Sequence, residues 1–256
     1  MRSITIIARN TFREAVRDRI LYNLVIFVLL VIGCAVLLGD LTDGQEARTI
    51  VNISLNAMLL FGVFIAIFVG VGLVSKEIEK RTVFAIFAKP VSRPQFIIGK
   101  YLGLCLTLLI NIVVMGLGVV AALAYVGDRE LVFSIWGAIY LIFLELAIVT
   151  SVAIVFSSFS SAALSALLTF LVFLIGHLST SLRDLGQALG SEVARIVFEI
   201  IYYVLPNLQL FSFRSEAANG LVPNAEMMLG ATAYALVYVV IMLAIAAFVF
   251  QRRNFK

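Results

Sequence analysis

Residues 75–95 read SKEIEKRTVFAIFAKPVSRPQ, a dense polar insert between two long apolar runs. With the five residues that follow, the insert holds six of the chain's 19 Lys and Arg residues and two of its four prolines. The apolar runs on either side, 53–74 and 96–126, contain one charged residue between them, Lys100. This pattern is typical of a water-exposed connection between two membrane-spanning helices. We therefore expect the insert to meet a partner outside the bilayer.

The composition of the whole chain indicates an integral membrane protein. Of the 256 residues, 62% are hydrophobic and 13% are charged, whereas soluble domains carry about 25% charged residues. Six apolar stretches have about the length that a helix needs to cross a hydrocarbon layer of roughly 30 Å. They are residues 20–39, 53–74, 96–126, 131–156, 162–180 and 229–250. The sequence therefore predicts an all-α fold with six transmembrane helices in one transmembrane domain, residues 1–256.

The distribution of basic residues predicts that both termini are cytoplasmic. Cytoplasmic loops of membrane proteins are enriched in Lys and Arg. Fourteen of the 19 basic residues fall in the segments that this topology places inside, which are 1–19, 75–100, 157–161 and 251–256. The other five fall in the segments that it places outside, which are 40–52, 127–130 and 181–228.

The longest of these outer segments, 181–228, contains an apolar stretch at 193–205 that is interrupted by charges. We predict a short helix there, lying at the outer membrane surface or dipping into it. Arg195 and Glu199 are four residues apart and are expected to pair on one face of this helix. Pro206 then ends the helix.

Residues 1–19 have the pattern of an amphipathic helix. Ile4, Ala8 and Phe12 recur at helical spacing, and a separate stripe is formed by Arg9, Arg13 and Arg17. Such a helix can lie in the membrane interface with its apolar side in lipid and its arginines near anionic head groups. The alternative is a solvated positive leader that only sets the topology.

Within the insert, the spacing predicts a helix, a sharp turn and a second helix on the cytoplasmic face. Residues 76–88 can form the first helix, which Lys89-Pro90 ends because the residue before a proline avoids the α region. Ser92 and Gln95 have the spacing of a capping box for the second helix, with Pro94 tolerated in its first turn. The alternative is an ordinary basic loop that merely obeys the charge rule.

Three polar residues in the predicted spans are candidates for a functional role: Glu145, Asn111 and His177. Glu145 is the one acidic residue within a predicted span, and an ionisable residue in the membrane needs a compensating partner. It is either a proton or cation relay or a structural residue paired within the helix bundle, and we favour the structural role. For His177, the chain's one histidine, we favour a hydrogen bond within the bundle.

The sequence contains no phosphate-binding loop, zinc-helix motif or Cys-x-x-Cys pair. Its two cysteines, Cys34 and Cys105, both lie in apolar runs. We therefore expect no metal site or catalytic centre, and we favour transport over an intramembrane enzyme. One form of transport that fits these residues is an ion- or proton-coupled secondary transporter that uses Glu145.

The insert and its surroundings resemble the permease subunits of ABC-2 type transporters, in the subgroup that includes permeases for nitrous-oxide-reductase maturation and gliding motility. In that family, an acidic and basic patch ending in Arg-Thr follows the second span. An apolar helix, a Pro-Val-Ser-Arg sequence and a Gly-Lys-Tyr sequence come after it. The corresponding residues here are 77–82, 90–93 and 99–101.

This resemblance implies a permease without an ATPase of its own, in which two permease subunits pair with two separate ATPase subunits. ATP and Mg²⁺ are then expected on the ATPase, and no cofactor on this chain. The resemblance assigns the coupling to the ATPase to Glu77, Glu79, Arg81, Thr82, Phe84, Phe87, Lys89, Pro90 and Arg93. It also implies export of an unknown substrate, a prokaryotic cytoplasmic (inner) membrane, contact with lipid and no role in binding nucleic acid.

Overall fold

A computed structural model describes residues 2–17, 26–27, 29–31, 33, 37, 45–79, 92–128, 130–188 and 192–252. In chain order, its elements are α1 (Arg2–Arg17), α3 (Glu46–Glu79), α5 (Arg93–Val126), α6 (Leu131–Ser157), α7 (Ala162–Ala188), α8 (Glu192–Val204), the 3₁₀ helix η1 (Leu208–Phe211), α9 (Arg214–Ala218) and α10 (Ala225–Arg252). No strand occurs among the described residues. The predicted all-α fold is therefore confirmed.

Five helices in the described ranges are long and apolar enough to cross a membrane. They cover Glu46–Gly72, Arg93–Val126, Leu131–Ser157, Ala162–Gly186 and Ala225–Arg252. A sixth crossing is counted if Arg195–Val204 and Leu208–Ala218, bent by 50° at the break between them, form one span. The first predicted span, 20–39, lies largely outside the described residues. These helices confirm a multi-pass integral membrane protein.

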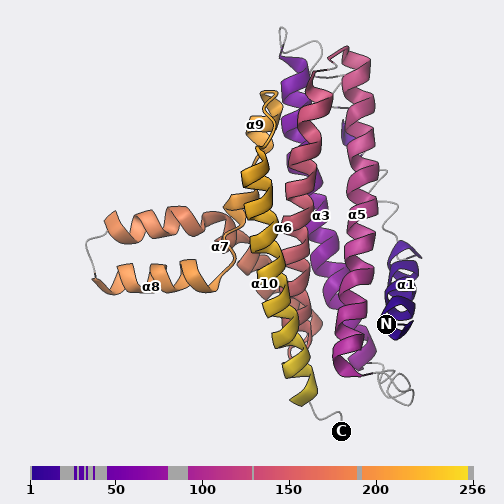
Figure 1. The fold of residues 1–256 in the computed structure, drawn as a ribbon, viewed down its shortest axis with the longest axis vertical. Coiled ribbons are helices and arrows are strands. Elements are labelled where there is room, and N and C mark those ends of the chain that lie inside the picture. Colours follow the sequence, from indigo (N-terminus) through magenta and orange to yellow (C-terminus); the bar gives the residue numbers. More distant parts are fainter. Residues whose placement is uncertain are drawn as a thin grey trace.

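Helices α3, α5, α6 and α10 run side by side, with α6 in the middle of the bundle (Figure 1). Most side chains of α6 are buried, because the helix is apolar on every side and has neighbours on several sides. Close packing here depends on a glycine. A side chain at Gly62 of α3 would collide with Leu146 of α6.

The N-terminal helix α1 packs against the first part of α5. Gly99 and Gly103 of α5 leave room for it, since an added Cβ would lie 2.7 Å from Ile7 and 2.6 Å from the Ala8 carbonyl oxygen. Arg9 and Arg13 are exposed, and Arg17 ends the helix. We expected the apolar side of α1 to lie in lipid. Part of that side instead covers α5, because the two glycines let the helix backbones approach closely.

The C-terminal part of α7 and helix α8 form a hairpin that projects sideways from the bundle (Figure 1). An added Cβ at Gly186 would lie 2.9 Å from the Phe198 ring, and the Arg183 guanidinium lies over the Tyr202 ring at 4.8 Å. Helix α7 continues to Ala188, beyond residue 180, where the fifth span was predicted to end.

The predicted pair of Arg195 with Glu199 in α8 is wrong. The carboxylate found beside Arg195 is that of Glu192, with Nη2 and Oε1 3.9 Å apart. This pair has i,i+3 spacing, which suits a helix face as well as the i,i+4 spacing we expected.

After α8 the chain turns at Pro206 and goes back into the bundle. Leu208 and Phe211 of η1 are fully buried, and α9 packs against both α3 and α6. The Ser134 hydroxyl of α6 donates a hydrogen bond to the Ala217 carbonyl oxygen at 2.9 Å. Residues 207–218 were assigned to an outer segment on their charge. They pack against α3, α6 and α7, because apolar residues such as Leu208 and Phe211 in this segment are buried by the bundle.

Candidate functional site

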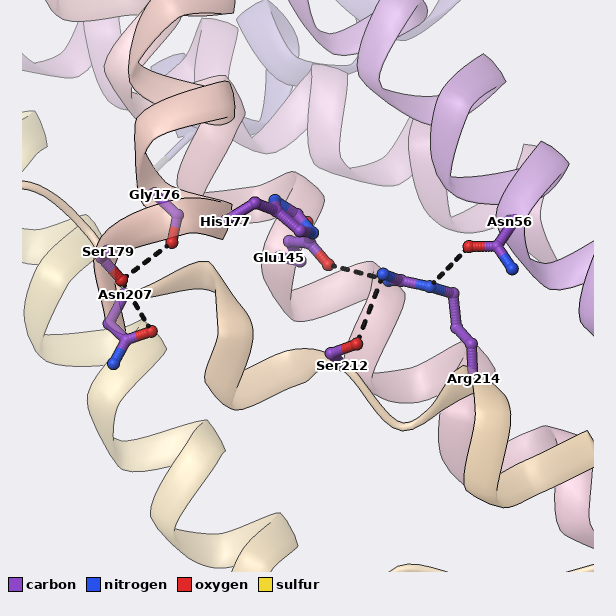
Figure 2. A network of polar contacts seen from close by, with 8 residues as sticks. All are labelled: Asn56, Glu145, Gly176, His177, Ser179, Asn207, Ser212 and Arg214. Atoms are coloured by element: carbon purple, nitrogen blue, oxygen red, sulfur yellow. Dashed lines mark hydrogen bonds and ion pairs between the residues drawn. The ribbon is translucent and has the colours of Figure 1, made fainter. Parts of the chain in front are cut away.

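The candidate site is a polar network around Glu145, at the middle of the central helix α6 (Figure 2). The Glu145 side chain is completely buried. Its Oε2 lies 3.7 Å from Nη1 of Arg214, on α9. Its Oε1 lies 3.4 Å from Nε2 of His177, on α7. The structure thus brings together two of the predicted residues and adds an arginine that we had counted among the outer charges.

Arg214 connects the carboxylate on α6 to helix α3. It lies at the start of α9 and is 8% exposed. Its Nε donates a hydrogen bond to Oδ1 of Asn56 at 3.0 Å, and its Nη2 donates to the Ser212 hydroxyl at 3.4 Å. The planar guanidinium thus contacts Asn56, Ser212 and Glu145 through three different nitrogens. A lysine ammonium has one nitrogen and cannot reproduce this geometry.

A second group of hydrogen bonds fixes the start of residues 207–218, which follow α8 and which we call the re-entrant segment. The Ser179 hydroxyl donates to Oδ1 of Asn207 at 3.1 Å. The backbone N–H of Asn207 donates to the Tyr234 hydroxyl of α10 at 2.9 Å. Together with Arg214, these bonds hold residues 207–214 against four different helices.

The chemistry of the network is that of a buried ion pair. A buried carboxylate is stable only with a compensating partner, and Arg214 supplies the positive charge. Within the described part of the chain, both oxygens of Glu145 and Nη1 of Arg214 lack a hydrogen-bond partner. The same residues include no group of three or more His, Cys, Asp or Glu side chains placed to hold a metal ion. The arrangement therefore joins α6 to α9 by charge and brings the imidazole of α7 beside the same carboxylate.

Asn111 does not belong to this network. It is buried on α5, where its Nδ2 donates to the Thr107 carbonyl oxygen of its own helix at 2.8 Å. Asn56 belongs to the network instead, through its bond with Arg214. Both asparagines lie within predicted spans, so the sequence does not separate them. Arg214 was missed because the charge rule counts any arginine between two spans as outside. The available signal was that Glu145, as a buried carboxylate, required a cation.

Most residues predicted for coupling to the ATPase, Arg81, Thr82, Phe84, Phe87, Lys89 and Pro90, lie outside the described residues. Glu77 and Glu79 fall in the last turns of α3, which runs without a break to Glu79. The first residues of the predicted separate helix 76–88 therefore continue the second span. The predicted start of the next helix is confirmed, with Arg93 as its first residue. The backbone N–H of Ser92 donates to Oε1 of Gln95 at 3.3 Å.

Arg93 joins the start of α5 to the end of α10. Its Nη1 donates hydrogen bonds to the carbonyl oxygens of Phe250 and Gln251, both at 2.8 Å. The Phe96 and Phe250 rings stack beside it with their centroids 5.7 Å apart. A cation at the C-terminal carbonyls of a helix also interacts favourably with the helix dipole. The last turn of α10 is therefore attached to the helix that follows the polar insert.

A polar cavity of about 440 Å³ lies between the start of α3 and helix α9. It is lined by Gln45, Arg48, Thr49, Asn52, Ile53, Ser215, Ala218 and Asn219. Asn52 connects the cavity to the network, because its Oδ1 accepts a hydrogen bond from Nδ2 of Asn56 at 2.7 Å.

Comparison with known protein families gives one match for nearly the whole chain. The model described as "ABC-2 family transporter protein" matches residues 5–255. No curated protein matches the chain. The match confirms the resemblance to the ABC-2 family that rested on residues 77–101, and the resemblance to a subgroup stays a prediction.

Proposed function

The chain belongs to the ABC-2 family of transporter proteins, and we propose that this permease is an exporter driven by a separate ATPase subunit. The proposed assembly contains two permease and two ATPase subunits, with ATP and Mg²⁺ bound by the ATPase. The polar insert 75–95 and helix α1 face that subunit. The family match lends no support to the alternative, a secondary transporter that uses Glu145.

One observation carries the proposed coupling: Arg93 ties the helix after the insert to the end of α10. Helix α1, the end of α3, the start of α5 and the end of α10 lie towards the same end of the bundle (Figure 1). Because α1 packs on Gly99 and Gly103, a displacement at the start of α5 is passed directly to α1 as well. A partner that moves the insert therefore moves three helices at once.

In the proposed mechanism, closure of the ATPase pair displaces the insert, and the spanning helices move between two access states. The charges from Glu77 to Arg93 select the partner and its register, since complementary charge at an interface affects specificity more than affinity. The buried pair of Glu145 and Arg214 holds the re-entrant segment on α6 throughout this movement. The termini are cytoplasmic, in a prokaryotic inner membrane.

Co-purification with the ATPase subunit tests this proposal. We expect Arg81→Glu and Phe84→Ala to reduce the amount of ATPase that co-purifies with the permease by about tenfold, because each removes an anchor of the interface. Arg195→Glu is the matched control, since Arg195 is exposed on the hairpin outside the bundle. Retention of the ATPase by the Arg81 and Phe84 variants, at the level of the control, would contradict the coupling role of the insert.

A further inference from the structure

The polar cavity between the start of α3 and helix α9 takes no part in the proposed coupling. Its volume of about 440 Å³ lies within the range of pockets that hold small organic ligands, about 300–1,000 Å³. Six of its eight lining residues are polar, and none of the described residues that line it is acidic. The charged side chain among them is that of Arg48. The cavity is therefore suited to a polar ligand with a negative charge.

The polar side chains of this cavity have donors to offer a ligand. Within the described part of the chain, the side chains of Gln45, Arg48 and Ser215 make no hydrogen bond or ion pair. The guanidinium of Arg48 holds its N–H groups in a rigid fork, which matches the oxygens of a phosphate or a carboxylate. The Gln45 amide and the Ser215 hydroxyl add neutral donors from α3 and α9, on either side of the cavity.

A chain of hydrogen bonds orients Asn52, which also lines the cavity. Arg214 can only donate, so Oδ1 is the atom of Asn56 that faces its Nε, at 3.0 Å. Nδ2 of Asn56 then donates to Oδ1 of Asn52 at 2.7 Å. Nδ2 of Asn52 is therefore the group left for a ligand, and it is a donor. Figure 2 shows Arg214 between Asn56 and Glu145, so a ligand held by Asn52 is connected to the buried ion pair.

The cavity lies at the end of the bundle opposite to the C-terminus, where α3 begins and α5 ends (Figure 1). Tyr125 and Phe133, at the adjoining ends of α5 and α6, are 82% and 79% exposed. Exposed aromatic side chains at helix ends are typical of the level at which a membrane meets water. The hydrogen bond from Ser134 to Ala217 holds α9 at the same level. Lipid phosphate groups lie at this level too.

We infer that this cavity is a binding site for a phosphate group that carries further polar substituents, with Arg48 as the charged residue that binds it. A phosphate offers three strong acceptor oxygens and a carboxylate two, so donors from two helices suit a phosphate better. The volume beyond the phosphate accommodates polar substituents such as hydroxyls. The phosphate belongs either to a lipid head group or to a small soluble ester, because the two share this chemistry. The inference does not rest on the proposed function, since such a site exists however the permease is driven.

Binding of two probes to the purified permease tests this inference. The soluble probe is glycerol 3-phosphate, titrated by calorimetry, and glycerol is its counterpart without the phosphate. The lipid probe is phosphatidylglycerol, whose retention is measured by native mass spectrometry, and diacylglycerol is its counterpart. We expect Arg48→Gln to weaken binding of at least one phosphate probe by about tenfold or more, because charge-assisted hydrogen bonds are lost.

Arg195→Gln is the matched control, since Arg195 is an exposed arginine on the hairpin. It should bind both probes as the unaltered protein does. Ser215→Ala, on the opposite wall of the cavity, is a second variant and should weaken binding about threefold, because one neutral hydrogen bond is lost. The side chains of Arg48 and Ser215 are exposed, so the unfolding midpoint without a probe should be the same for all these variants.

The two probes distinguish the sources of the phosphate. Weaker binding of glycerol 3-phosphate to Arg48→Gln would support the site with a soluble ester as its ligand, and weaker retention of phosphatidylglycerol alone would support a lipid head group. Equal binding of both probes by Arg48→Gln and Arg195→Gln would overturn the inference, as would failure of both to bind the unaltered protein. Glycerol or diacylglycerol binding as tightly as its phosphate counterpart would also overturn it, because the cavity would then not recognise the phosphate.

Discussion

Arg93 and Arg214 each join helices that are far apart in the sequence, and they do so in different surroundings. Arg214 lies at the centre of the bundle, where it meets the Glu145 carboxylate and the Asn56 amide oxygen. Arg93 lies at one end of the bundle, where it meets two backbone carbonyl oxygens of α10. Arg214 is therefore paired with an opposite charge, and Arg93 with the negative end of the α10 helix dipole.

This difference indicates different roles for the two arginines. A buried ion pair is hard to separate, because either partner left alone is an uncompensated charge in a medium of low polarity. A cation at the end of a helix stays closer to water, and its contribution to stability is smaller. We conclude that Arg214 fixes the architecture, and we propose that Arg93 transmits movement from the polar insert to α10. The following variants separate these roles.

The largest effect is expected for Arg214→Gln. This change leaves Glu145 buried without its cation, which costs about 3–5 kcal/mol of stability. Thermal unfolding of the purified permease, followed by fluorescence of Trp136 on α6, the chain's one tryptophan, measures the loss. An unfolding midpoint equal to that of the unaltered protein would show that the pair does not hold the re-entrant segment.

The double variant Glu145→Gln/Arg214→Gln is expected to recover at least about half of that loss. Replacing both partners removes the uncompensated charge, and two amides can hydrogen-bond to each other in the same space. The same unfolding measurement applies. A double variant less stable than Arg214→Gln would mean that Glu145 and Arg214 act through other partners.

A smaller effect on stability is expected for Arg93→Ala, about 1 kcal/mol, because two hydrogen bonds at a partly solvated helix end are lost. Its effect on coupling should be much larger, since the end of α10 loses its hydrogen bonds to α5 and keeps packing contacts such as the stacking of Phe96 on Phe250. In membranes with the ATPase subunit, we expect the subunit to stay bound. Arg93→Lys keeps the charge and serves as the matched control.

The smallest effect is expected for Arg195→Ala on the hairpin. The side chain is 53% exposed and its partner Glu192 is 81% exposed, and exposed ion pairs contribute about 0–1 kcal/mol. The unfolding midpoint should stay within error of the unaltered protein. A loss comparable to that of Arg214→Gln would show that the hairpin is part of the structural core.

The sequence alone was sufficient for the features that depend on local chemistry. The apolar runs predicted helices, and Ser92, Pro94 and Gln95 predicted where α5 begins. The need for a partner at Glu145 could also be stated from the sequence, because a buried carboxylate requires one. In each of these cases the deciding interaction lies within one helix or between the chain and the bilayer.

The identity of that partner could not be derived from the sequence. Arg214 reaches Glu145 only because the chain re-enters the bundle after Pro206, and no local pattern distinguishes this arginine from Arg183 or Arg195. The spacing of Arg48, Asn52 and Asn56 is visible in the sequence. Whether these side chains face protein, water or lipid depends on which face of α3 the other helices cover. These features follow from packing between distant segments.

Hydrogen–deuterium exchange on the complex of permease and ATPase tests the central claim most directly. Exchange is measured on the complex without nucleotide and on the complex trapped with ATP and vanadate, and the two are compared. In the unaltered permease, we expect protection to change together in residues 93–103 and in residues 244–252. In Arg93→Ala, the change should persist in 93–103 and disappear from 244–252. An unaltered response of both segments in Arg93→Ala would contradict the proposal that Arg93 carries the movement to α10.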